Sequence, residues 1–194
     1  MAAVFIESYK LPSVDRREAL RYAGVSSSNF DLEELRLRLD EAIALSEGKL
    51  NPRVCFCELD VSSCDFLGSL DVRKNLRRSQ SIILFAATVG IELDRLIAKY
   101  SVLSPATALL LQALGNERVE ALCDAFNEDM RKKKLSQGFC LRPRFSPGYG
   151  DLPLEYQKTV FELLSPSRIG ITLNDSYFMT PSKSVTAIIG VEKI

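Results

Sequence analysis

The segment from Arg142 to Asp151, with the sequence RPRFSPGYGD, holds the residues best suited to bind a small ligand. Its two arginines flank Pro143, and a guanidinium can hold a carboxylate through two parallel hydrogen bonds. Gly148 and Gly150 flank Tyr149, and glycine allows tight turns and a close approach of the backbone to a ligand. The residues and spacing alone favour a simpler interpretation, a turn between a strand and a helix with solvent-exposed arginines.

A second polar segment runs from Leu173 to Gly190, with the sequence LNDSYFMTPSKSVTAIIG. Polar residues gather around Pro181, namely Asn174, Asp175, Ser176, Ser182, Lys183 and Ser184. A loop of this kind can line a polar pocket, because loops supply a large share of binding residues. The alternative is a surface loop that leads into a buried strand from Val185 to Val191.

The absence of histidine excludes several kinds of chemistry. Ser-His-Asp and Cys-His nucleophile systems, histidine-containing zinc sites and imidazole ligation of a cofactor are not available to this sequence. Cys55 and Cys57 are placed on one face of a strand, with Cys64 nearby. Their spacing lacks Cys-x-x-Cys pairs and a fourth close ligand. We therefore expect reduced, structural cysteines, no metal site and no assigned catalytic residue.

Three carboxylates, Glu117, Glu120 and Asp124, fall near one face of a predicted helix because residues three and four apart are neighbours there. They could form an acidic pair, although a solvated helix stripe is the simpler interpretation. The turn at Thr88-Val89-Gly90 lacks a nucleotide-binding fingerprint, and the sequence has no Walker loop.

Hydrophobic periodicity and capping residues predict the elements that position these segments. Helices are predicted over residues 15–24, 31–47, 69–76, 91–100, 105–134 and 153–164. Strands or extended segments are predicted over residues 53–59, 81–87, 139–144, 169–173 and 184–191. Asp15 with Glu18 matches a capping box, and Ser104 followed by Pro105 marks the start of the long helix. Gly115 lies inside that helix and could break it.

This order of elements predicts a single domain of the α/β or α+β class over residues 1–194, with a twisted mixed or antiparallel sheet covered by helices. The formal net charge is zero, from 25 basic and 25 acidic residues, which argues against a nucleic-acid partner. The basic run from Arg131 to Lys134 is interpreted as a solvated helix end. No apolar run approaches the roughly 20 residues that span a bilayer, and no secretory signal is visible. With five cysteines and no disulfide framework, we expect a cytoplasmic protein that has no membrane segment.

Several stretches taken together resemble one family. RFSPGYGDLPLEYQ, from Arg144 to Gln157, is followed by IGITLNDSYFMTPSKSVTAIIG, from Ile169 to Gly190. The central stretches SLDVRKNLRRSQSIILFAATVGIELDRLI and ALGNERVEAL precede them. In this order they resemble the activation domain of vitamin B12-dependent methionine synthase, and most of all its short, free-standing relatives. The likeness extends from about Leu11 onward.

The resemblance implies a function. The activation domain of the fused synthase binds S-adenosylmethionine and takes part in the reductive remethylation of oxidised cobalamin, with an electron from a flavodoxin-type donor. By resemblance, Arg144 would hold the methionyl carboxylate, and Pro147, Gly148 and Tyr149 would shape the ligand cleft. The chain would then act as a stand-alone activation partner of a cobalamin-dependent methionine synthase or related corrinoid methyltransferase, with the cobalamin carried by the partner.

Two other hypotheses remain open. The sequence ends at Ile194, shortly after SVTAIIG, and shows neither the tail that follows this motif in the fused synthase nor that protein's N-terminal acidic ligand residue. This departure motivates the alternative of a non-catalytic docking module for a corrinoid protein, with a lost ligand site. A third hypothesis is an independent redox protein that uses its cysteines.

Overall fold

The computed structural model describes residues 2–25, 32–66 and 68–194. At its centre is a five-stranded sheet in the order β1-β2-β3-β7-β4. The strands are β1 (Phe5–Ser8), β2 (Arg53–Asp60), β3 (Ser79–Thr88), β7 (Ser184–Lys193) and β4 (Phe139–Leu141). Every neighbouring pair is antiparallel. The expected sheet covered by helices is confirmed, and it is the antiparallel form.

Strand β3 lies in the middle of this sheet. Its residue Phe85 stands opposite Phe56 of β2 on one side and Ala187 of β7 on the other. The run from Ile82 to Val89 is fully buried because helices cover both faces of the sheet. A strand buried on both faces has an unbroken apolar run instead of alternation, and this pattern was the basis for predicting a central strand.

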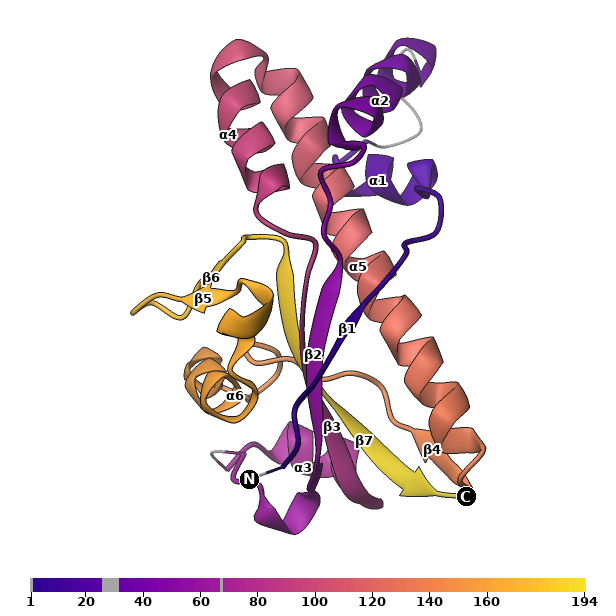
Figure 1. Ribbon diagram of the computed structural model, residues 1–194, viewed down its shortest axis with the longest axis vertical. Helices are drawn as coiled ribbons and strands as arrows, with labels where there is room; N and C mark the ends of the chain where they lie inside the picture. The colour runs from indigo at the N-terminus through magenta and orange to yellow at the C-terminus, as the bar shows by residue number, and fades with distance from the viewer. Residues whose placement is uncertain (1, 26–31, 67) are drawn as a thin grey trace.

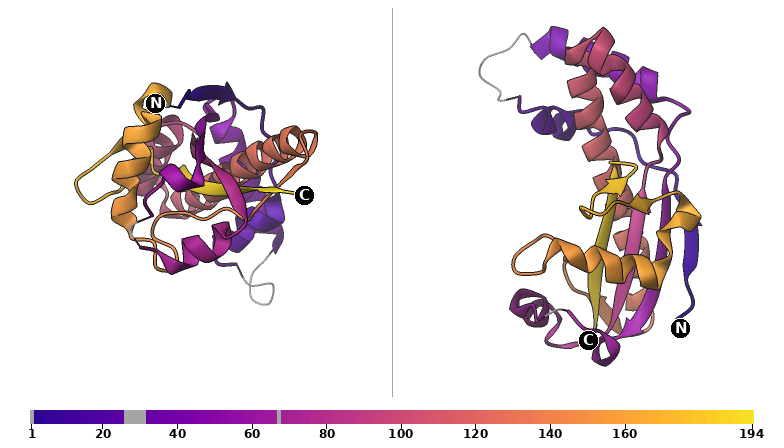
Figure 2. Two further views of the ribbon diagram at one scale, coloured as in Figure 1. Left: turned by 90° about the horizontal axis from the view of Figure 1, so that it is seen from below. Right: turned by 90° about the vertical axis from the view of Figure 1, so that its left-hand side faces the viewer.

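Helices cover the two faces unequally, as Figure 1 and Figure 2 show. The helices are α1 (Arg16–Tyr22), α2 (Leu32–Ser46), α3 (Leu70–Leu76), α4 (Glu92–Leu103), α5 (Pro105–Leu135) and α6 (Gln157–Leu164). The long helix α5 packs along one face, where Phe126 lies 4.8 Å from Phe85 between ring centroids. Helices α3 and α6 pack on the other face, around the buried side chains of Leu84, Tyr156 and Val160.

Beyond the end of the sheet, α1, α2, α4 and the first half of α5 form what we call the helical extension (Figure 1). Ser104 caps α5 as predicted, with Pro105 in its first turn. Asp15 caps α1 by accepting hydrogen bonds from the amides of Arg17 and Glu18. The predicted capping box is incomplete, because the Glu18 carboxylate pairs with Arg21 instead.

Several other predictions need correction. Gly115 does not break α5, which continues through it to Leu135. Residues 169–173 are not a strand: a 3-10 turn, Pro166–Ile169, is followed by Gly170 with φ of 85°, leaving β5 with only Thr172–Leu173. Its partner β6 (Met179–Thr180) and the edge strand β1 were not predicted. The start of the predicted helix at Asp31 lies outside the described residues.

None of the helices that the structure describes has the length and apolar character needed to cross a membrane.

Candidate functional site

A cavity of about 420 Å³ opens between α5, α6, the β5–β6 hairpin and the start of β7. Its lining comes from three parts of the chain: α5, residues 146–157 and residues 177–186. The lining residues used below are Glu120, Pro147, Tyr149, Gln157, Phe178 and Thr186. The two segments singled out in the sequence, RPRFSPGYGD and the polar loop before β7, therefore meet at one cavity.

The first wall is the loop of residues 144–151, which is fastened to the sheet at its start. The amide and carbonyl of Phe145 exchange hydrogen bonds with Ile188 of β7, at 2.9 and 2.8 Å. The loop then closes on itself, because the amide of Gly148 donates to the carbonyl of Leu152 at 2.9 Å. Gly148 has φ of 88°, a left-handed conformation that favours glycine. Pro147 and Tyr149 are thereby turned toward the cavity.

The end of the same loop is fastened to α3 by Asp151. Its carboxylate accepts hydrogen bonds from the Ser69 hydroxyl, from the amide of Leu70 at 2.7 Å and from the amide of Asp71 at 3.2 Å. These bonds, the Ser69 bond above all, lower the pKa of Asp151. A carboxylate at the start of a helix satisfies amides that have no partner within the helix. Asp151 thus fixes the loop in space.

Arg144 lies behind this wall. Its Nη2 atom is 3.1 Å from an oxygen of Glu120 and 2.9 Å from an oxygen of Asp124, both on α5. Its Nη1 atom is buried and has no hydrogen-bond partner among the described residues. A guanidinium offers five N–H donors, so Arg144 keeps donors for a further acceptor while Glu120 holds it in place.

The second wall is polar and comes from β7 and α6. Thr186 is buried and donates from its hydroxyl to the side-chain oxygen of buried Gln157 at 2.8 Å. Ser184 donates to the Thr88 hydroxyl at 2.9 Å. These bonds satisfy polar side chains in and behind this wall that would otherwise be costly to bury.

Aromatic side chains stand at the mouth of the cavity. Tyr149 and Phe178 are 71% and 66% exposed, although both are large and largely apolar. Tyr177 has φ of 64°, and its ring lies 5.0 Å below the Lys158 ammonium. The mouth therefore offers planar apolar surfaces, the second wall offers hydroxyl and amide groups, and Glu120 supplies a carboxylate. This set of groups suits a polar ligand with a flat ring and a cationic centre.

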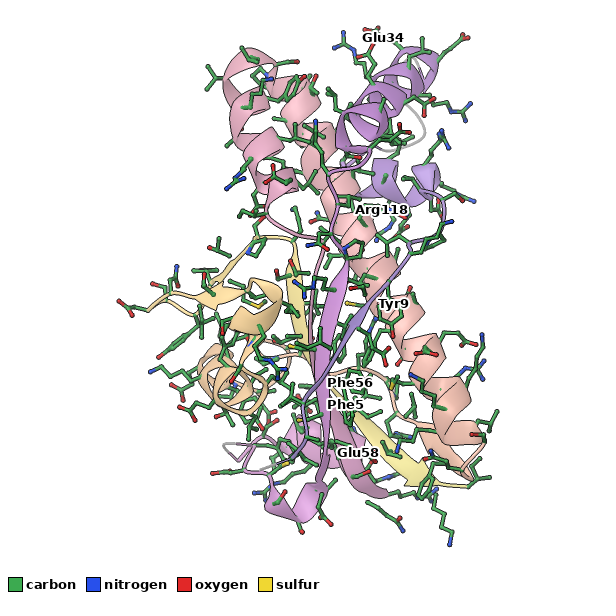
Figure 3. All side chains as sticks on the ribbon, in the orientation of Figure 1. Phe5, Tyr9, Glu34, Phe56, Glu58 and Arg118 are labelled. Carbon is green, nitrogen blue, oxygen red and sulfur yellow. The ribbon has the colours of Figure 1, made fainter. Side chains whose placement is uncertain are left out.

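The structure corrects the interpretation of the acidic residues on α5 as a solvated stripe. Glu117 is only 4% exposed and pairs with buried Arg118, which also donates to the carbonyls of Pro12 and Ser13. This pair fastens the segment between β1 and α1 to α5. Figure 3 shows Arg118 on α5 beside that segment. Glu120 lines the cavity, and only Asp124 is largely solvated. The helical spacing was the available signal, but it does not reveal which part of the fold faces those carboxylates.

The cysteines lie apart from this site. Cys55 and Cys57 are buried side by side under α6, as their strand positions predicted, and burial raises the pKa of each thiol to about 11. All five cysteines are free. Within residues 2–25, 32–66 and 68–194, no group of histidine, cysteine and acidic residues is arranged to hold a metal ion.

Comparisons with known proteins bear on the whole fold. A family model described as the activation domain of vitamin B12-dependent methionine synthase matches residues 62–193. Among solved structures, the chain is similar to the MetH reactivation domain bound to AdoHcy, with a TM-score of 0.68 and 16% sequence identity. The match covers 97% of this chain and 78% of that one, and at this identity it shows the shared fold alone. No curated protein matches the sequence.

Proposed function

The chain belongs to the family of the vitamin B12-dependent methionine synthase activation domain, and we propose that it binds S-adenosylmethionine in the cavity between α5, α6 and β7. It would do so as the activation partner of a cobalamin-dependent methionine synthase or related corrinoid methyltransferase. The observation that supports this most directly is that Glu120, which lines the cavity, pairs with Arg144 behind the cavity wall.

The groups of the cavity match the parts of this ligand. By the family resemblance Arg144 would bind the methionyl carboxylate through charge-assisted hydrogen bonds. Its Nη1 donor has no partner among the described residues but is buried, and Arg144 does not line the cavity, so the ligand would have to displace part of the wall to reach it. Glu120 suits the cationic sulfonium or ammonium group. Tyr149 and Phe178 offer faces on which an adenine ring can stack. The related reactivation domain was solved with AdoHcy, the product that remains after the methyl group leaves S-adenosylmethionine.

The chain would contribute binding and orientation, and the partner's cofactor would supply the difficult chemistry. When bound to the partner, the cobalamin would supply the reductive methyl transfer, with an electron from a flavodoxin-type donor. This chain would hold S-adenosylmethionine with its methyl group at the mouth of the cavity and keep the S-adenosylhomocysteine that remains. The exposure of Tyr149 and Phe178 at the mouth agrees with such a reaction, because the methyl group must be reached from outside the chain.

Calorimetric titration of S-adenosylmethionine into the purified protein tests this proposal. We expect saturable binding, and we expect Arg144→Ala to weaken it by about 1.5–3 kcal/mol, the range for a charge-assisted hydrogen bond. The matched control is Arg142→Ala, the other arginine of the motif, which bonds to the carbonyl of Asn75 away from the cavity. Equal affinity of Arg144→Ala and the parent would show that Arg144 does not hold the ligand.

The exposure of Tyr149 and Phe178 also supports a second candidate, a docking module for a corrinoid protein with no bound ligand. Exposed aromatic residues are typical of protein interfaces. A complex with a cobalamin-loaded methyltransferase, formed by a protein that does not bind S-adenosylmethionine in the absence or presence of that partner, would establish this alternative.

A further inference from the structure

The polar wall of the cavity is tied to the helical extension directly behind it. Ser182 donates from its amide and its hydroxyl to the two carboxylate oxygens of Asp94 on α4, at 2.6 and 2.7 Å. The next residue, Lys183, donates from its ammonium to the side-chain oxygen of Asn116 on α5 at 2.8 Å. Two successive residues of one loop are therefore held by two different helices.

Lys183 reaches Asn116 through the interior of the protein. The residue is only 8% exposed, and burial lowers the pKa of its ammonium group. Its aliphatic stem passes over Gly115 of α5: a Cβ atom there would lie 2.8 Å from Cε of Lys183 and 2.8 Å from a methyl group of Leu93 on α4. Glycine inside a helix costs about 1 kcal/mol relative to alanine. The space it leaves for the lysine is a physical reason for its presence in α5.

The backbone of the same residue closes the end of the sheet. The carbonyl of Lys183 accepts a hydrogen bond from the amide of Val89 at 3.2 Å, immediately after β3. Ser182 and Ser184, on either side of Lys183, both line the cavity. A shift of Lys183 therefore moves two residues of the cavity wall together.

We infer that Asp94, Asn116 and Lys183 are positioning residues of the cavity, which hold the Ser182–Ser184 wall in place for the ligand without touching it. We call these three residues, with Gly115, the Lys183 clamp. The inference rests on the proposed function for the identity of the ligand. It assigns α4 and the middle of α5 a role in binding, although neither Asp94, Gly115 nor Asn116 lines the cavity.

Lys183→Met tests the clamp most sharply. Methionine keeps the apolar stem beside Gly115 and removes the ammonium group. The cost of burying the ammonium group is removed together with its hydrogen bond to Asn116, and because these two effects oppose each other we expect the melting temperature to change little. Affinity for S-adenosylhomocysteine, measured by calorimetry, should fall by about tenfold, because the Ser182–Ser184 wall is no longer held in one position for the ligand. A residue with a merely structural role would lower stability and affinity together.

Two further variants separate positioning from folding. Gly115→Ala should lower both stability and affinity, because its methyl group meets the lysine stem. The pair Gly115→Ala with Lys183→Ala should recover part of the stability, since the lysine stem is gone and only the Leu93 methyl group still meets the new side chain, but it should not recover affinity. Lys99→Met, an exposed lysine on α4, is the matched control and should change neither property.

The rate of hydrogen exchange at the amides of Ser182 and Val89 measures how firmly the clamp holds the loop, and it needs no ligand. Slow exchange in the parent and faster exchange in Lys183→Met supports the clamp. Faster exchange with unchanged affinity would overturn the positioning role, as would recovery of affinity in the Gly115→Ala, Lys183→Ala pair. If the parent binds no S-adenosylhomocysteine, the proposed ligand is wrong. In that case, equal exchange rates in the parent and in Lys183→Met would reject the clamp as well. Faster exchange in Lys183→Met would show that the clamp holds the Ser182–Ser184 wall even though the proposed ligand does not bind there.

Discussion

The two faces of the central sheet are covered in different ways. On one face, the continuous helix α5 packs against β2, β3 and β7, with Phe126 within 4.8 and 5.1 Å of the rings of Phe85 and Phe56. On the other face, α3 and α6 are short and are flanked by turns, and the cavity opens beside α6. The difference suggests that the two faces contribute differently to stability and to ligand binding. The α5 face has a continuous aromatic core around Phe126, and the face of α3 and α6 holds the loops that form most of the cavity wall. Helix α5 adds Glu120 to that wall and supports it through Asn116.

The largest effect that we expect comes from Phe126→Ala on the α5 face. Removing this fully buried ring should lower the free energy of unfolding by about 3–5 kcal/mol, because a large cavity is left in the core. Urea unfolding measures the loss, and calorimetry on the folded fraction should show unchanged affinity for S-adenosylmethionine.

Phe178→Ala, at the mouth of the cavity, is the matching variant for the other face. It should weaken binding and leave urea unfolding unchanged, because its ring is 66% exposed. If Phe126→Ala weakened binding as strongly as Phe178→Ala, the division between the two faces would be wrong.

The next effect concerns the buried pair that fastens the N-terminal segment to α5. Arg118→Met leaves the Glu117 carboxylate without its partner in the interior, and we expect a loss of roughly 3 kcal/mol in urea unfolding. Glu117→Gln combined with Arg118→Met removes both charges and should recover part of that loss. Equal stability of the single and double variants would show that the uncompensated carboxylate is not the cause.

Asp151→Ala should have the smallest effect on stability among these variants. We expect it to weaken binding clearly. Its carboxylate ties the 144–151 loop to α3, so its loss should weaken S-adenosylmethionine binding by on the order of tenfold, the effect of one charge-assisted hydrogen bond. Glu155→Ala, an exposed carboxylate nearby, is the control. An Asp151→Ala variant with the parent's affinity would show that the loop holds its shape without this anchor.

Asp151 also makes a prediction about pH. Its pKa is lowered in the folded protein from an ordinary value of 3.8. The ionised group therefore stabilises the fold above that value, and the contribution is lost as the pH falls through the folded-state pKa. We therefore expect Asp151→Asn to be less stable than the parent at neutral pH and to lose less stability as the pH falls through this range. Acid unfolding of both proteins, followed by circular dichroism, measures the difference.

Local signals were enough to predict much of the framework. The unbroken apolar run of β3, the cap at Ser104 and the helical spacing along α5 all act over a few residues, and each was confirmed. The strand predicted over residues 169–173 failed because apolar residues there pack from a 3-10 turn, and Gly170 redirects the chain. Strand β1 has only four residues, too few to show a period.

The site was harder to predict, because its contacts join distant parts of the chain. Of the four residues that the motif singled out, Pro147 and Tyr149 line the cavity, whereas Arg144 and Gly148 do not. Nothing local indicates that Asp151 bonds to the amide of Leu70, or that Lys183 occupies the space above Gly115. The ladder between β3 and β7 brings such pairs together, and a sequence without an alignment gives no sign of it.

That ladder also has a consequence for the order in which the protein can fold. β3 and β7 pair along nearly their whole length, from Thr88 opposite Ser184 to Ser79 opposite Glu192, yet α4, α5 and α6 all lie between them in the chain. During synthesis the most apolar strand of the molecule must wait, with one edge unpaired, until β7 has left the ribosome. Contacts this distant in sequence slow folding and prolong the exposure of apolar segments. We therefore expect α5, which can form early and cover one face of β3, to act as its temporary shield.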